Sequence, residues 1–162
     1  MGMRPQHGYT AVELMVTLGV LAIILMIAAP QMGPFLRKQQ VKNASMDITS
    51  AVALARSEAV KRNAPVYVVA SNAGWTGGWT VNTTGTVLPA SSSSTLRAQA
   101  SMDGINITES NSHTQFNFGG DGRLQSTGMS FTVNTSIATT GVTPLCVNVG
   151  ATGRVQTTNG GC

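Results

Sequence analysis

The sequence predicts an α+β fold in which one long N-terminal helix precedes a β-rich domain. Two observations predict this arrangement. No charged side chain occurs at positions 14–36, a run of 23 residues, and apolar residues then recur every three or four positions as far as Arg62. After Pro65 this period gives way to short β-branched runs separated by turn-forming residues. The 162 residues suffice for such a helix and one domain with a modest core.

We expect a continuous helix over residues 10–62, with a bend at Pro30 and a second candidate bend at Gly33-Pro34. It should end near Asn63-Ala64-Pro65, because the residue before a proline avoids helical geometry. Its second half, 36–63, is amphipathic and should pack on the following domain through one stripe. That stripe comprises Val41, Ala44, Ile48, Ala51, Ala55 and Ala59.

The uncharged run is long enough to cross a bilayer as a helix, so we assign residues 9–35 to a transmembrane or filament-core segment. A buried core helix would usually show a polar face, which this run lacks. A removable secretory signal would be cut after small residues, but the best such site, Ala28-Ala29, is followed by Pro30. Both alternatives fit these residues less well than a retained membrane helix.

The start of the run carries a specific motif. Residues 8–18 read GYTAVELMVTL, which resembles the class III signal of type IV pilins and type II secretion pseudopilins. The resemblance implies that a prepilin peptidase removes a leader of residues 1–8 by cutting between Gly8 and Tyr9, and then methylates the new terminus. Glu13 becomes the fifth mature residue, which is the acid position of that family. Tyr9 and Ala11-Val12 depart mildly from the commoner Phe and Leu-Ile.

The position of Glu13 also has a physical interpretation. Cleavage creates an amine at Tyr9 in apolar surroundings, and the Glu13 carboxylate of a neighbouring subunit would neutralise it in a filament. An unpaired charge there would cost several kcal/mol of desolvation free energy. The alternative is a surface acid at the end of a helix.

The segment 64–162 has the composition of an extracytoplasmic β-rich domain, since only 10% of all residues are charged and Gly, Ser, Thr and Asn abound. Glycine-rich stretches at 74–78 and 119–122 are expected turns, and 89–94 an expected flexible loop. The expected strands are 66–70, 79–82, 86–88, 96–100, 105–108, 114–117, 129–134 and 145–149.

Four further segments indicate a branch of the family. Residues 54–63, 75–79, 121–123 and 153–155 resemble the GspH/FimT group of minor pilins and pseudopilins. The resemblance implies a type IV pilin fold, with the helix packed on antiparallel β-sheet and no catalytic activity. It also implies other major and minor pilins as partners, an inner-membrane location before assembly, and a cell-surface pilus afterwards.

Cys146 and Cys162 are the only cysteines. In an oxidising compartment such a pair predicts a disulfide. The bond would close a loop of 17 residues, which contributes about 3 kcal/mol in the chain-entropy model. We find no phosphate-binding glycine loop, metal-ligand cluster or nucleophile triad in the sequence, so we expect neither an enzyme nor a cofactor or metal.

Residues near the C-terminus raise the question of DNA. In the FimT type of minor pilin, a Gly-Arg-x-Arg motif binds DNA during uptake for natural transformation, and this chain has Gly153-Arg154-Val155-Gln156. Arg154 matches, whereas Gln156 can offer hydrogen bonds but no charge. Arg123 would join them if the fold brings the two loops together. The alternative is that Arg154 is an ordinary residue of a solvated turn.

The sequence therefore predicts a minor pilin of a type IV pilus, of the FimT/FimU type, that acts in pilus assembly or in a tip complex. Binding of double-stranded DNA for natural transformation is an additional hypothesis. The alternative within the same family is the minor pseudopilin H of a type II secretion system.

Overall fold

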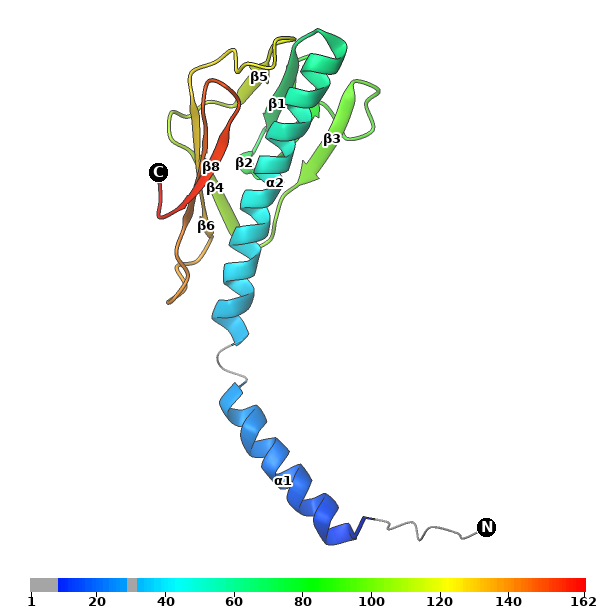
Figure 1. Ribbon diagram of the computed structural model, residues 1–162, viewed down its shortest axis with the longest axis vertical. Helices are drawn as coiled ribbons and strands as arrows, with labels where there is room; N and C mark the ends of the chain where they lie inside the picture. Colours follow the sequence, from blue (N-terminus) through cyan, green and yellow to red (C-terminus); the bar gives the residue numbers. More distant parts are fainter. Residues whose placement is uncertain (1–8, 29–31) are drawn as a thin grey trace, which may run out of the picture.

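The computed structural model describes residues 9–28 and 32–162, which contain two helices and eight strands (Figure 1). The helices are α1 (Ala11–Ala28) and α2 (Met32–Arg62). The leader with Gly8 and the expected bend at Pro30 lie outside the described residues, so the continuity of the helix across that bend stays a prediction.

Helix α1 begins directly after Thr10. The Glu13 amide donates to Thr10 Oγ1 at 3.2 Å, which is the hydrogen bond of an N-cap, and an acid in the first turn suits a helix N-terminus. Most of its apolar side chains are exposed around the whole circumference. No helix within residues 9–28 and 32–162 is long and apolar enough to cross a membrane. Residues 29–31 of the expected segment 9–35 lie outside the described residues, so the assignment of 9–35 stays a prediction.

Helix α2 confirms the amphipathic pattern. Its end at Arg62 agrees with the sequence, and Asn63 follows in the left-handed region with a φ of 48°. The Ala64 amide still donates to the Ala59 carbonyl, so the last turn closes before Pro65. The face that packs on the sheets comprises Val41, Ala44, Ser45, Ile48, Ala51, Val52, Ala55 and Ala59.

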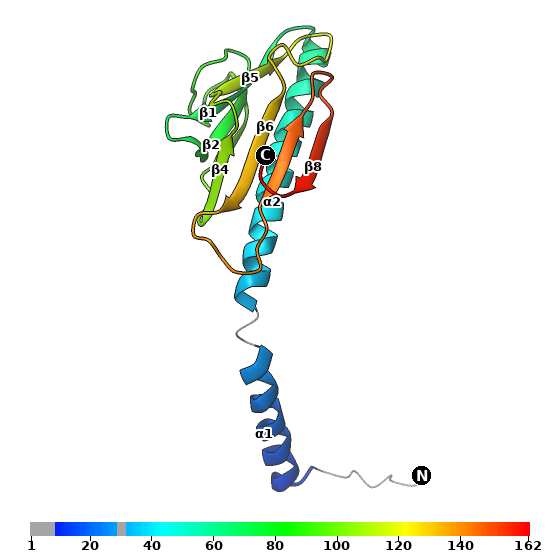
Figure 2. The same ribbon diagram turned by 90° about the vertical axis from the view of Figure 1, so that its left-hand side faces the viewer.

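Two four-stranded antiparallel sheets pack against α2 (Figures 1 and 2). Sheet A has the order β3-β2-β1-β5 and sheet B the order β4-β6-β7-β8, so the α+β class and the antiparallel pairing are confirmed. The strands are β1 (Val66–Ser71), β2 (Gly74–Asn82), β3 (Thr95–Ala100), β4 (Ile105–Glu109), β5 (Gln115–Phe118), β6 (Met129–Thr135), β7 (Leu145–Val149) and β8 (Val155–Asn159).

The glycine-rich stretch 74–78 was expected to be a turn, but it forms the first half of β2. The turn lies at Asn72-Ala73. The glycines have a packing role instead. A Cβ on Gly78, whose φ is +96°, would lie 2.2 Å from the Gln99 carbonyl oxygen of β3. Glycine in a strand interior marks such a close backbone approach.

Two other assignments differ from the sequence prediction. Residues 86–88 are not a strand, because the buried Asn82 side chain folds this segment into a loop: it accepts from the Gly85 amide at 2.8 Å and donates to the Thr86 carbonyl at 2.9 Å. The tail contains the unpredicted strand β8, which is paired with β7 over its full length.

Aromatic side chains join the two sheets in the core. The Trp75 ring lies 5.9 Å from that of Phe116 in sheet A and 4.8 Å, edge to face, from that of Phe131 in sheet B. The indole N–H of Trp75 donates to the His113 carbonyl at 2.7 Å. A polar contact supplements this packing, since Thr76 Oγ1 accepts from the Ile107 amide at 2.9 Å.

Candidate functional site

The N-terminal candidates Tyr9 and Glu13 lie at the start of α1, and both are exposed. Within residues 9–28 and 32–162 the Glu13 carboxylate forms no ion pair. Its amide completes the Thr10 cap, but this bond uses the main chain and leaves the carboxylate free to face another subunit. Gly8, the other processing residue, lies outside the described residues.

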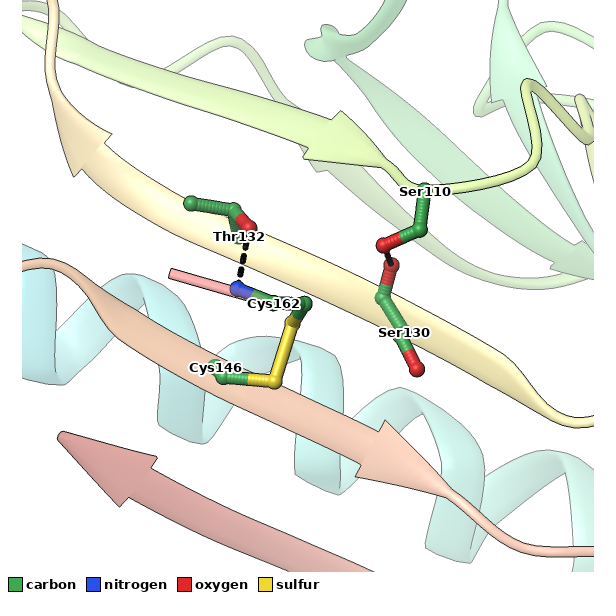
Figure 3. Close-up of a disulfide and its surroundings, with 5 residues drawn as sticks. All are labelled: Ser110, Ser130, Thr132, Cys146 and Cys162. Carbon is green, nitrogen blue, oxygen red and sulfur yellow. Dashed lines mark hydrogen bonds between the residues drawn. A yellow bond between two sulfur atoms is a disulfide. The ribbon is translucent and has the colours of Figure 1, made fainter. Parts of the chain in front are cut away.

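The two cysteines form the predicted disulfide (Figure 3). Their Cα atoms are 5.1 Å apart, and the Cys162 amide donates to Thr132 Oγ1 of β6 at 2.9 Å. The bond lies on the face of sheet B that points away from α2 (Figure 3). It fixes the last residue, Cys162, to the sheet, three residues beyond the end of β8 at Asn159.

The fold brings together the two loops that carry Arg123 and Arg154. The Leu124 amide, next to Arg123, donates to the Ala151 carbonyl at 3.0 Å, so loop 119–123 lies beside loop 150–154. Both arginines are exposed. Gln156 lies in β8, whereas Arg154 directly precedes that strand. The condition under which Arg123 would join Arg154 is met.

A third arginine, which was not among the candidates, lies beside these two loops at one end of the β-rich domain 64–162, which we call the head. The Arg56 side chain of α2 covers two buried glycines, Gly122 and Gly153, one from each loop. A Cβ on Gly153 would lie 3.1 Å from Arg56 Cδ, and one on Gly122 would lie 3.5 Å from Arg56 Nε. Both glycines also have positive φ, 72° and 75°, which disfavours other residues. The glycines of the two loop motifs could have indicated that another side chain packs closely on these loops. They could not show that this side chain comes from α2.

The remaining cations nearby are already paired. Arg62 Nε lies 2.8 Å and Lys61 Nζ 3.3 Å from the Glu58 carboxylate. These hydrogen bonds, first that of Arg62 and then that of Lys61, lower the pKa of Glu58. In the described part of the chain, Arg56, Arg123 and Arg154 form no ion pair. One carboxylate, that of Asp121, lies in the same loop as Arg123 and accepts from its amide at 3.0 Å.

The family is decided by the match of a sequence-family model. The model of the type II transport protein GspH matches residues 44–153. The chain belongs to the GspH family. The expected resemblance to the GspH/FimT group of minor pilins and pseudopilins is thereby confirmed, and no curated protein matches the chain.

Solved structures show the same fold as this GspH-family chain. Two crystal structures of the type IV minor pilin FimU of Pseudomonas aeruginosa match with TM-scores of 0.58 and 0.60, both at 21% identity. They cover 72% and 75% of this chain and 91% and 90% of the FimU chains. At this identity the similarity shows the type IV pilin fold alone.

The GspH match divides the candidates. It includes Arg56 and Arg123 and ends at Gly153, one residue before Arg154. Glu13, strand β8 and Cys162 lie outside it, so their roles depend on the geometry of this chain.

Proposed function

We propose that the chain is a minor pilin of a type IV pilus that acts in filament assembly or in a tip complex with other pilins, without catalytic activity. The observation that carries this proposal is the combination of a pilin-type processing motif at 8–18 with an exposed, almost wholly apolar helix. An apolar surface around a whole helix requires an apolar environment. The inner membrane supplies it before assembly, and the helices of neighbouring subunits supply it in the filament.

The proposed maturation uses Gly8, Tyr9 and Glu13. Prepilin peptidase cuts after Gly8 and methylates the Tyr9 amine, which is the only new charge created at the helix start. The Glu13 carboxylate of the next subunit neutralises that amine when the helices stack in register. Removing one partner of such a desolvated pair leaves the other charge uncompensated, which is costly.

The test is to express Glu13→Gln in cells of the source bacterium from which the gene has been deleted, and to measure incorporation into sheared pili. Glutamine keeps the capping geometry at the start of α1 but removes the charge. We expect a loss of incorporation of at least about tenfold, with normal processing at Tyr9 by mass spectrometry. Thr17→Ala, which removes the other polar side chain of α1, is the matched control and should be incorporated normally.

Two results would contradict this proposal. If the Glu13→Gln variant were incorporated into pili at the wild-type level, the Glu13 carboxylate would have no role in assembly. A deletion strain with normal pili but impaired protein secretion would favour the alternative, a minor pseudopilin H of a type II secretion system, which the description of the matching family model also suggests.

A second candidate function is capture of double-stranded DNA. The observation that favours it is that Arg56, Arg123 and Arg154 lie on adjoining segments and form no ion pair among the described residues. Phosphate binding grows with the number of cations brought to the backbone. Arg154 is the arginine that matches the motif, Arg56 and Arg123 would add two cations, and Gln156 adds a hydrogen-bonding group two residues after Arg154.

A salt titration of duplex binding tests this candidate on the full chain in nonionic detergent. With three phosphate contacts, affinity should fall about 40-fold between 50 and 200 mM salt, and Arg154→Ala should reduce the salt slope by about one. Arg37→Ala, near the other end of α2, is the control for charge alone. Absence of binding at low salt, or equal effects of the two variants, would exclude DNA capture by this cluster.

A further inference from the structure

Strand β8 is an edge strand of sheet B. The hydrogen bonds beyond its two ends show which of its main-chain groups bond to β7 and which point away from the sheet. Beyond each end of the strand pair, the Gly150 amide donates to the Arg154 carbonyl at 2.9 Å and the Gly160 amide to the Pro144 carbonyl at 2.8 Å. Bonded positions alternate along an antiparallel ladder, so the intervening bonds to β7 belong to Gln156 and Thr158. The main-chain N–H and C=O groups that point away from the sheet belong to Val155, Thr157 and Asn159.

These outward-facing residues also line a groove between β8 and α2, which we call the α2–β8 groove. It consists of two adjoining hollows of about 940 and 580 Å³ that share Thr49 and Ala53 of the helix. Val155, Thr157 and Asn159 form its strand side. Unpaired main-chain groups and an open groove therefore follow the same stretch of chain.

The helix side of the groove is a second, exposed face of α2. Phe35, Met46 and Val60 line it and have 65%, 54% and 53% of their surfaces exposed. Residues 155–159 contain no proline and no charge, which are two of the usual protections of a strand edge against pairing. An apolar groove beside a free strand edge suits an added strand, which gains main-chain bonds from the edge and side-chain contacts from the groove.

The charges of the groove select the partner. Its charged lining residues are all cationic, namely Lys38, Lys42, Arg56 and Lys61, and only Lys61 has an acidic partner among the described residues. A second copy docked through the same face would bring two sets of cations together without an acid between them. An acidic segment would instead neutralise them.

We propose that the α2–β8 groove binds an extended, acidic segment of a neighbouring protein subunit, which adds a ninth strand to the head by pairing with β8. Alternate side chains of an extended segment face α2. This facing set includes apolar side chains, which contact Phe35 and Met46, and carboxylates, which reach Lys38 and Lys42. This inference goes beyond the minor-pilin function, because it requires only that the partner be a protein with such a segment.

The experiment uses the full chain in nonionic detergent and two blocked hexapeptides, a Glu-Val peptide (Glu-Glu-Val-Val-Glu-Glu) and a Lys-Val peptide (Lys-Lys-Val-Val-Lys-Lys). In both, each face of the extended chain carries charged and apolar side chains. Amide hydrogen exchange is followed residue by residue by NMR. The Glu-Val peptide should bind saturably and slow exchange at Thr157 and Asn159, while Gln156 and Thr158, already bonded to β7, change little. Lys42→Glu should weaken this binding at least about fivefold, and Arg37→Glu, outside the groove lining, should leave it within about twofold.

Three outcomes would overturn the proposal: no protection of the outward-facing amides, equal binding of the Lys-Val peptide, or protection of the same amides by self-association measured by light scattering. Protection of these amides by a DNA duplex but not by the acidic peptide would also overturn it and assign the groove to nucleic acid. Each result is independent of the Glu13→Gln pilus assay, so failure of one proposal is distinguishable from failure of the other.

Discussion

Replacing Trp75 with alanine should lower the free energy of unfolding of the head by about 3–5 kcal/mol. Trp75 is 6% exposed, and its ring meets Phe116 of sheet A and Phe131 of sheet B. The substitution removes the largest side chain at the junction of the sheets and leaves a cavity bordered by aromatic rings. It also leaves the His113 carbonyl without its indole donor.

Urea unfolding of the full chain in detergent, followed by the fluorescence of the remaining Trp79, measures this effect. Trp75→Phe separates the two contributions, because it keeps most ring contacts but not the N–H, and should cost about 1–3 kcal/mol. Phe35→Ala is the matched control, since that exposed ring should change stability by less than about 0.5 kcal/mol. A Trp75→Ala midpoint equal to that of Phe35→Ala would show that the sheets do not depend on this aromatic cluster.

The sequence was most informative where a periodic pattern extends over many residues or where a few neighbouring residues form a motif. The apolar stripe of α2 and its end at Arg62 follow from spacing and from Pro65, and both are confirmed. The cysteine pair was predictable because two cysteines allow one intramolecular pairing. The assignment of residues 9–35 to a membrane or filament-core segment stays a prediction, because residues 29–31 lie outside the described residues.

The sequence failed where a residue acts through tertiary contact. Gly77-Gly78 has the composition of a turn, but Gly78 allows the close approach of the β3 backbone, and a Cβ on Gly77 would collide with Ser71 and Ala73. These contacts can be seen only once the strands are placed. Strand β8 consists mostly of polar residues with little strand propensity, and its five residues are all paired with β7. Arg56 could not be predicted as a site residue, because the loops that it covers lie far away in the sequence.

The disulfide beyond the end of β8 leads to a second prediction with a large effect. Cys162→Ser should destabilise the head by about 3 kcal/mol, because opening a 17-residue loop returns conformational freedom to the unfolded chain. Cys162 is exposed, so the serine hydroxyl remains solvated and adds no burial cost. The wild-type chain treated with a reductant should unfold at the same urea concentration as the variant, and the variant should not respond to the reductant.

The same substitution links stability to the proposed docking edge. Without the bond, the Cys162 amide loses its fixed position beside Thr132, and the Gln156 and Thr158 amides should exchange faster as β8 separates from β7. Since an added strand needs an ordered edge, Cys162→Ser should also weaken binding of the acidic peptide, although it removes no residue of the groove. An unchanged midpoint in urea together with slow exchange at these amides would show that the ladder between β7 and β8 holds the tail without the disulfide.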